Sequence, residues 1–144
     1  MFKVDQTTFG GKDTPLKQQG NCFQSCVATV LQIPLDEAFN HSSYADDEWL
    51  LEFNKWLEQY GLGCIFVEMS QEKPANTTTL KGINIAECMS KTLYNGERHA
   101  VVIRDHFELL HDPNPNAKEQ GEVQGVYIFV PLEPYKLVRT GVMK

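Results

Sequence analysis

An apolar pattern of helical period dominates residues 49–60. Large apolar side chains recur three or four positions apart along this stretch: Trp49, Phe53, Trp56 and Tyr60. This spacing places them on one face of a helix. Gly61 follows directly and is typical of a helix end. We therefore expect a helix here whose aromatic face belongs to the hydrophobic core.

A second helical pattern covers residues 22–33. Asn21 is a favoured N-cap residue, and Gln24 stands three positions later, where it closes a capping box. The apolar positions that follow have helical spacing, namely Cys26, Val27, Val30 and Leu31. Pro34 disfavours helical geometry in the residue before it, so we expect this helix to end near Ile33.

After Gly61 the apolar pattern changes to that of extended chain. Short apolar runs bounded by polar residues, glycine or proline predict strands at residues 63–69, 99–104, 107–112 and 125–132. The stretch INIAECMSKTL, residues 83–93, is expected to form a further helix. Helices come first and a sheet second, without repeats or a linker. The pattern predicts one α+β domain spanning residues 1–144.

Composition and charge narrow the range of partners. The formal net charge of −6 argues against nucleic acid, because affinity for phosphate comes largely from Lys and Arg. No stretch approaches the roughly 18 apolar residues of a membrane helix, and the N-terminus does not resemble an export signal. We therefore expect a soluble, cytoplasmic protein with no membrane partner. In such a compartment disulfides rarely persist, so the four cysteines are expected to be free thiols.

Candidate chemistry begins with the cysteine at the start of the first helix. With Asn21 as N-cap, Cys22 is the first helical residue, beside free backbone N–H groups and the positive end of the helix dipole. This setting stabilises a thiolate. Cys26 lies one turn further in, and we expect it to be a buried neighbour. Cys64 and Cys88 are expected to be buried hydrophobic residues.

A base for this cysteine is predicted from the sheet. If Asp105 and His106 form a two-residue hairpin loop, Arg104 pairs with Phe107, and His99 faces Asp112. Opposed residues project to the same side of a sheet, so Asp112 would orient the His99 imidazole. A slip of one residue would place them on opposite faces.

Other interpretations of the same residues remain open. A histidine at a strand start is often purely structural, and an aspartate before Pro113 is typical of a turn. A zinc site is a further alternative, although a single C-x-x-x-C is a weak metal signal. Its ligands would be Cys22, Cys26, His99 and His111.

Two motifs, GNCFQSCVATVLQIPLDE (20–37) and HAVVIRDHFELLHDPNP (99–115), together resemble the papain-like cysteine peptidase superfamily, particularly its small bacterial and phage-encoded proteins. The resemblance covers about residues 6–115. It implies a papain-like fold, with a cysteine-bearing helix packed on an antiparallel sheet, and neither metal nor cofactor. By the same resemblance Cys22 is the nucleophile, His99 the general base and acid, and Asp112 the residue that orients it.

The expected oxyanion hole departs from the family pattern. These enzymes carry a glutamine about six residues before the nucleophile to stabilise the oxyanion, and here Leu16 holds that position. Gln6 is the first choice, because a loop from Gly10 to Gly20 would leave and return the chain. Gln19 is the alternative; its string QGNC resembles the family's glutamine motif, which also raises Cys26 as a rival nucleophile.

The expected function is a cysteine hydrolase or acyltransferase acting on an amide, peptide or isopeptide bond through a thioester. Its partner would be a peptide or protein substrate, or a small amide, in a bacterial or phage-infected cell. The alternative is a papain-like binding module with a vestigial triad, for example a phage protein that engages a host protein.

Overall fold

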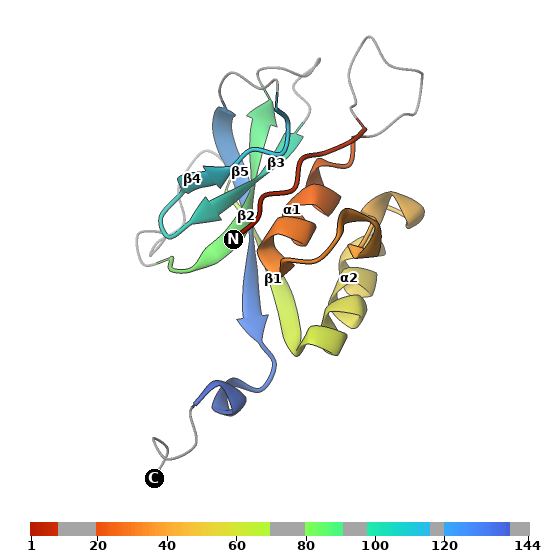
Figure 1. The fold of residues 1–144 in the computed structure, drawn as a ribbon, viewed down its shortest axis with the longest axis vertical. Helices are drawn as coiled ribbons and strands as arrows, with labels where there is room; N and C mark the ends of the chain where they lie inside the picture. The colour runs from red at the N-terminus through yellow and green to blue at the C-terminus, as the bar shows by residue number, and fades with distance from the viewer. Residues whose placement is uncertain (9–19, 70–79, 91–97, 116–119, 139–144) are drawn as a thin grey trace.

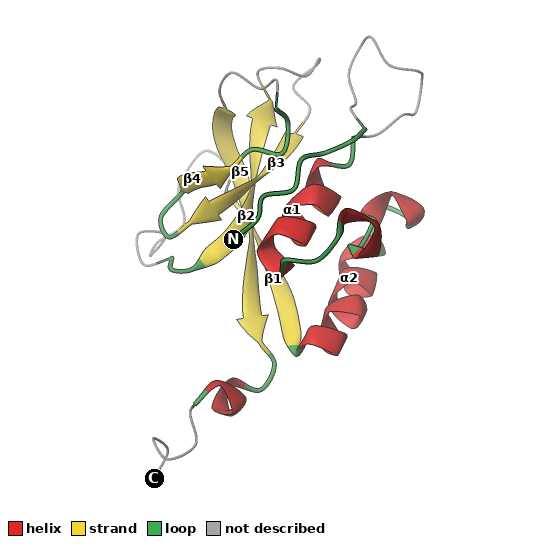
Figure 2. Ribbon diagram, viewed as in Figure 1, coloured by secondary structure: helices red, strands yellow, loops and turns green. Residues whose placement is uncertain are grey.

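The computed structural model describes residues 1–8, 20–69, 80–90, 98–115 and 120–138. Its centre is a five-stranded sheet with strand order β1-β5-β2-β3-β4, in which all neighbouring strands are antiparallel. The strands are β1 (Leu62–Glu68), β2 (Ile83–Ser90), β3 (Arg98–Arg104), β4 (Glu108–His111) and β5 (Gln120–Pro131). Both helices lie on the same side of the sheet (Figures 1 and 2). The expected α+β class is confirmed.

The two expected helices are present. They are α1 (Cys22–Leu31) and α2 (Trp49–Leu57), and a 3-10 turn, Glu58–Tyr60, continues α2 up to Gly61. Gly61 adopts a left-handed conformation with φ of 72° and ends the helix, as expected. Further 3-10 turns lie at Leu35–Glu37, His41–Ser43 and Pro134–Leu137. No helix in the described ranges is long and apolar enough to cross a bilayer.

The helix expected at residues 83–93 is wrong. Residues 83–90 form strand β2, which lies between β5 and β3 in the middle of the sheet, and residues 91–93 lie outside the described part of the chain. Neighbouring residues of β2 are buried on opposite faces, for example Ile85 and Ala86. A strand covered on both faces has a continuous apolar run, and periodicity alone does not separate such a run from a short helix.

The main core lies between the helices and the sheet. Val27 of α1 and Phe53 of α2 pack with Ile85 of β2 and Val102 of β3, and all four are fully buried. A smaller cluster on the other face of the sheet includes Val101 and Val126. Of the aromatic residues expected in the core, Phe53 is buried, Trp49 and Trp56 are partly exposed, and Tyr60 is exposed.

The side chain of Asn54 joins α2 to strand β1. Its Oδ1 accepts the backbone N–H of Cys64 at 2.8 Å, and its Nδ2 donates to the Cys64 carbonyl at 3.1 Å. The amide thus satisfies both backbone groups of one residue, as a neighbouring strand would.

Asn54→Ala is expected to lower the free energy of unfolding by about 1–3 kcal/mol, because it leaves part-buried backbone groups of Cys64 without partners. Asn54→Asp should cost at least as much, because a carboxylate oxygen would face the Leu50 and Cys64 carbonyls, to which the amide now donates. Urea denaturation measures both variants. Gln59→Ala is the control, because Gln59 is exposed and donates locally to the Trp56 carbonyl just after α2. Equal stability of Asn54→Ala and wild type would refute this role.

Candidate active site

The structure brings Cys22, His99 and Asp112 together. Cys22 is the first residue of α1, which packs against β3, and His99 is the second residue of β3. Asp112 follows the last residue of β4. His99 Nε2 donates to Asp112 Oδ1 at 2.6 Å, and the imidazole also hydrogen-bonds Cys22. The thiol, the imidazole and the carboxylate therefore form one line of hydrogen bonds.

The imidazole of His99 is buried, with 6% of the residue exposed. Because Asp112 engages Nε2, Nδ1 is the ring nitrogen that faces the thiol. Burial by itself lowers the pKa of His99, but the hydrogen bonds to Asp112 and Cys22 and the negative charges of both groups outweigh it and raise the pKa to about 9. The imidazole is thus held in its cationic form near neutral pH.

Asp112 is fixed in turn by the backbone. Its Oδ1 accepts the N–H of Asn114 at 2.9 Å, which closes a short turn around Pro113. The turn chemistry expected of Asp112 is therefore present in addition to the bond with His99. The oxygen that accepts from His99 is therefore the one that the backbone turn holds, so it orients the imidazole without depending on a free side-chain rotamer.

The hairpin that carries His99 and Asp112 differs from the expected register. Its loop is three residues, with positive φ at Asp105 (51°) and Phe107 (58°), so Arg104 pairs with Glu108. A register shift follows, and Val102 pairs with His111. The expected pairing of His99 with Asp112 is wrong by two residues. The extra loop residue shifts the register by one position, and the shift between Val102 and Ile103 adds a second. One such shift would move a side chain to the opposite face of the sheet, and two return it, so His99 and Asp112 still share one side.

Cys26 is a poor rival nucleophile. It is fully buried, and burial followed by the negative charges of Cys22 and Asp112 raises its pKa well above the ordinary value. Burial likewise raises the pKa of Cys64 to about 12 and that of Cys88 to about 11, the latter with help from Asp112 and Glu87. All four cysteines of the chain are free thiols, and only Cys22 is partly exposed.

The start of α1 differs from the expected capping box. Asn21 is the N-cap residue, but among the described residues its side chain caps none of the helix N–H groups. Its Oδ1 accepts the N–H groups of Thr7 and Thr8, both at 2.9 Å. Gln24 donates instead to the carbonyl of Leu35 at 3.0 Å. The Asn21 side chain thus makes a long-range contact in place of the expected helix cap. This contact attaches Thr7 and Thr8 beside Cys22.

Gln6 bonds to two segments of the chain, one next to Asp112 and one next to Cys22. Its backbone N–H donates to the Pro113 carbonyl at 2.9 Å, next to Asp112. Its side-chain Nε2 donates at 3.0 Å to the Thr8 carbonyl, which also accepts the N–H of Asn21, next to Cys22. The side chain is buried, and its Oε1 has no hydrogen-bond partner among the described residues. Gln19 and residues 9–19 of the expected loop lie outside the described ranges.

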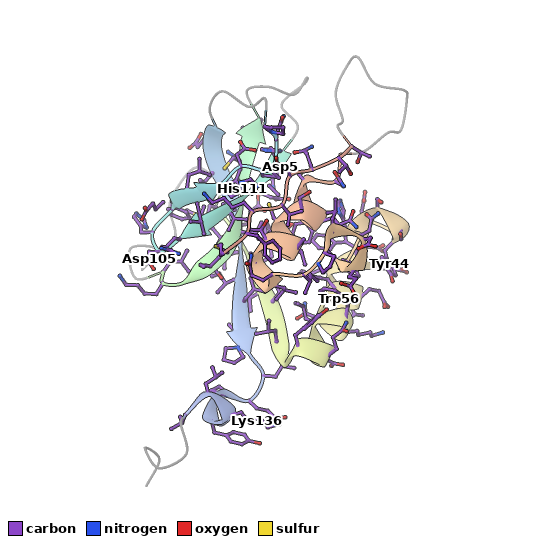
Figure 3. All side chains as sticks on the ribbon, in the orientation of Figure 1. Asp5, Tyr44, Trp56, Asp105, His111 and Lys136 are labelled. Atoms are coloured by element: carbon purple, nitrogen blue, oxygen red, sulfur yellow. The ribbon has the colours of Figure 1, made fainter. Side chains whose placement is uncertain are left out.

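His111, one of the expected alternative zinc ligands, holds the N-terminal segment. Its Nε2 lies 3.0 Å from the Val4 carbonyl oxygen and 3.2 Å from Asp5 Oδ1, and Figure 3 shows Asp5 and His111 side by side. Val4 also donates its N–H to Thr29 of α1 at 2.9 Å. The first residues of the chain thus run between α1 and β4 (Figure 1). Sequence patterns do not reveal this role, because the two ends of the contact are more than a hundred residues apart.

Within the described part of the chain, no three His, Cys, Asp or Glu side chains gather in an arrangement that would hold a metal ion. Comparisons of the chain with protein family models, with curated proteins and with solved structures found no match.

Proposed function

We propose that the protein is a papain-like cysteine hydrolase or acyltransferase that acts on an amide, peptide or isopeptide bond. The observation that carries the proposal is the buried His99 imidazole, bonded to Asp112 through Nε2 and to Cys22. This arrangement suits an activated cysteine, which needs a neighbouring base and a group that orients the base. The position of Cys22 at the start of α1 adds the positive end of the helix dipole.

The proposed reaction begins with a Cys22 thiolate and a His99 imidazolium. The sulfur attacks the carbonyl carbon, and the carbonyl electrons move onto oxygen to form a tetrahedral oxyanion. Collapse of this intermediate breaks the C–N bond, and His99 gives its proton to the leaving amine. The thioester is then attacked by water, which makes the protein a hydrolase, or by another nucleophile, which makes it a transferase. His99 takes the proton of the attacking group, and the thiolate is released.

Two N–H donors are proposed for the oxyanion. One is the backbone N–H of Cys22, in the first turn of α1, where intrahelical carbonyl partners are missing. The other is the second N–H of the Gln6 amide, whose first N–H is held by Thr8. The burial of Gln6 supports this role, because a donor excluded from water stabilises a developing charge more strongly.

Gln6→Ala is expected to slow acylation of Cys22 by p-nitrophenyl acetate by about a hundredfold, the usual effect of removing one oxyanion donor. Alkylation by iodoacetamide should be unchanged, because that displacement forms no oxyanion. Release of nitrophenol and intact mass follow the two reactions. An equal loss in both would show that Gln6 supports the site structurally, and no loss in either would remove it from the oxyanion hole.

The free thiols of all four cysteines support a reducing compartment, and we propose the cytoplasm of a bacterial or phage-infected cell. A peptide, a protein or a small amide would each suit the same three side chains, since nucleophile and base do not determine the substrate.

A further inference from the structure

Arg98, which directly precedes His99, is bonded to two carboxylates on other strands. Its guanidinium donates to Glu68 of β1 at 2.8 Å and to Glu87 of β2 at 3.0 Å. Glu87 is held from its other side by the hydroxyl of the buried Tyr127, which donates to its Oε1 at 3.1 Å. The first residue of β3 is thus tied to three other strands of the sheet.

The sheet register explains how one side chain reaches this far. Glu68 and Glu87 both pair with Gly125 of the intervening strand β5, so the two carboxylates flank a position without a side chain. The ring of Phe66 lies over this glycine, and a Cβ there would come within 2.4 Å of its Cζ. The Arg98 guanidinium therefore bridges β2 and β1 across β5.

We propose that Arg98 is a positioning residue for His99: the bridge to Glu68 and Glu87 fixes the start of β3, and with it the distance between the imidazole and Cys22. The inference rests on the proposed function, because it assumes that His99 activates Cys22. Asp112 fixes the orientation of the ring, and Arg98 fixes the backbone that carries it. Exposed ion pairs add little stability, but a small displacement of a reacting group costs much reactivity.

The test compares the rate of iodoacetamide alkylation of Cys22 at pH 6 between variants of the 144-residue chain and the wild type. Arg98→Met, which keeps an unbranched apolar stem but removes the guanidinium, should slow the reaction about tenfold. The double variant Glu68→Gln and Glu87→Gln should slow it to a similar degree, although the amide introduced at position 87 still accepts the Tyr127 hydroxyl. Combining all three substitutions should add little, because they remove one and the same bridge.

Whether the double variant reacts more slowly or faster than wild type shows whether Arg98 acts by positioning His99 or only through its positive charge. If Arg98 acted only through its positive charge, its loss would slow formation of the thiolate, but loss of the two negative charges would speed it. A faster double variant would therefore overturn the inference. Glu52→Gln is the matched control, since it breaks another exposed ion pair, to Lys55 on α2, and should leave the rate unchanged.

Two further results separate this inference from the proposed function. An unchanged rate in Arg98→Met, in a protein whose alkylation still depends on His99, would overturn the positioning role alone. Alkylation of wild type that does not depend on His99 would overturn both. Thermal unfolding excludes a general loss of structure, because the Arg98 and Glu variants should melt within a few degrees of wild type.

Discussion

Cys22→Ala should abolish acylation by a broad thiol-directed acyl probe, a loss of at least about a thousandfold. The probe reacts with an ionised, accessible sulfur, and Cys22 is the one partly exposed cysteine of the four in the chain. Cys26→Ala is the matched control on the same helix. Its sulfur is fully buried and its pKa is raised by burial, so the label should remain. Incorporation is measured by intact mass.

Labelling of the wild type and of the two variants decides between an enzyme and a binding module. Labelling that is lost in Cys26→Ala and kept in Cys22→Ala would exchange the nucleophile for its buried neighbour. A wild-type protein that takes no label would favour the binding module with a vestigial triad. Labelling that depends on Cys22 alone supports the enzyme.

His99→Ala should slow alkylation of Cys22 by iodoacetamide at pH 6 by on the order of a hundredfold. An isolated cysteine, with a pKa of about 8.5, is ionised to less than about 1% at that pH. In the wild type the pKa of His99 is raised to about 9, so the imidazolium that stabilises the thiolate persists until the pH approaches 9. The wild-type rate should therefore rise less steeply with pH between 6 and 8 than the rate of the variant.

The pH profile of the variant shows the sign of this effect. Without the imidazolium, the rate of His99→Ala should rise about tenfold per pH unit towards pH 8.5, and the difference from wild type should shrink. Asp112→Asn should slow the reaction because it removes the negative charge beside His99. The effect should be smaller than that of His99→Ala, because the new amide oxygen can still accept a hydrogen bond from Nε2. Parallel profiles for wild type and His99→Ala would show that the imidazole does not activate the thiol.

Local sequence signals predict where the two helices begin and end. A polar N-cap before Cys22 identifies the start of α1, and the Gly61 stop identifies the end of α2. The pairing of His99 with Asp112 is predicted by counting along a hairpin, and the count is wrong by two residues. The two side chains still meet because the extra loop residue and the register shift between Val102 and Ile103 each reverse the face of the sheet, so that together they leave it unchanged.

The features that sequence patterns miss all depend on contacts between distant segments. Asn21 has the residue type of a capping box, yet Thr7 and Thr8 compete for its side chain. Strand β2 resembles a helix in sequence because both of its faces are buried. The Arg98 bridge depends on the register of three strands around Gly125, which no local spacing encodes.

We propose that Cys22, activated by His99 and Asp112, is the nucleophile of the protein. The most direct measurement is peptide mapping after brief treatment of the wild-type protein with a low excess of iodoacetamide at pH 6. We expect Cys22 to be modified first, with Cys26, Cys64 and Cys88 unmodified. Modification of Cys26 before Cys22, or equal modification of all four cysteines, would contradict it.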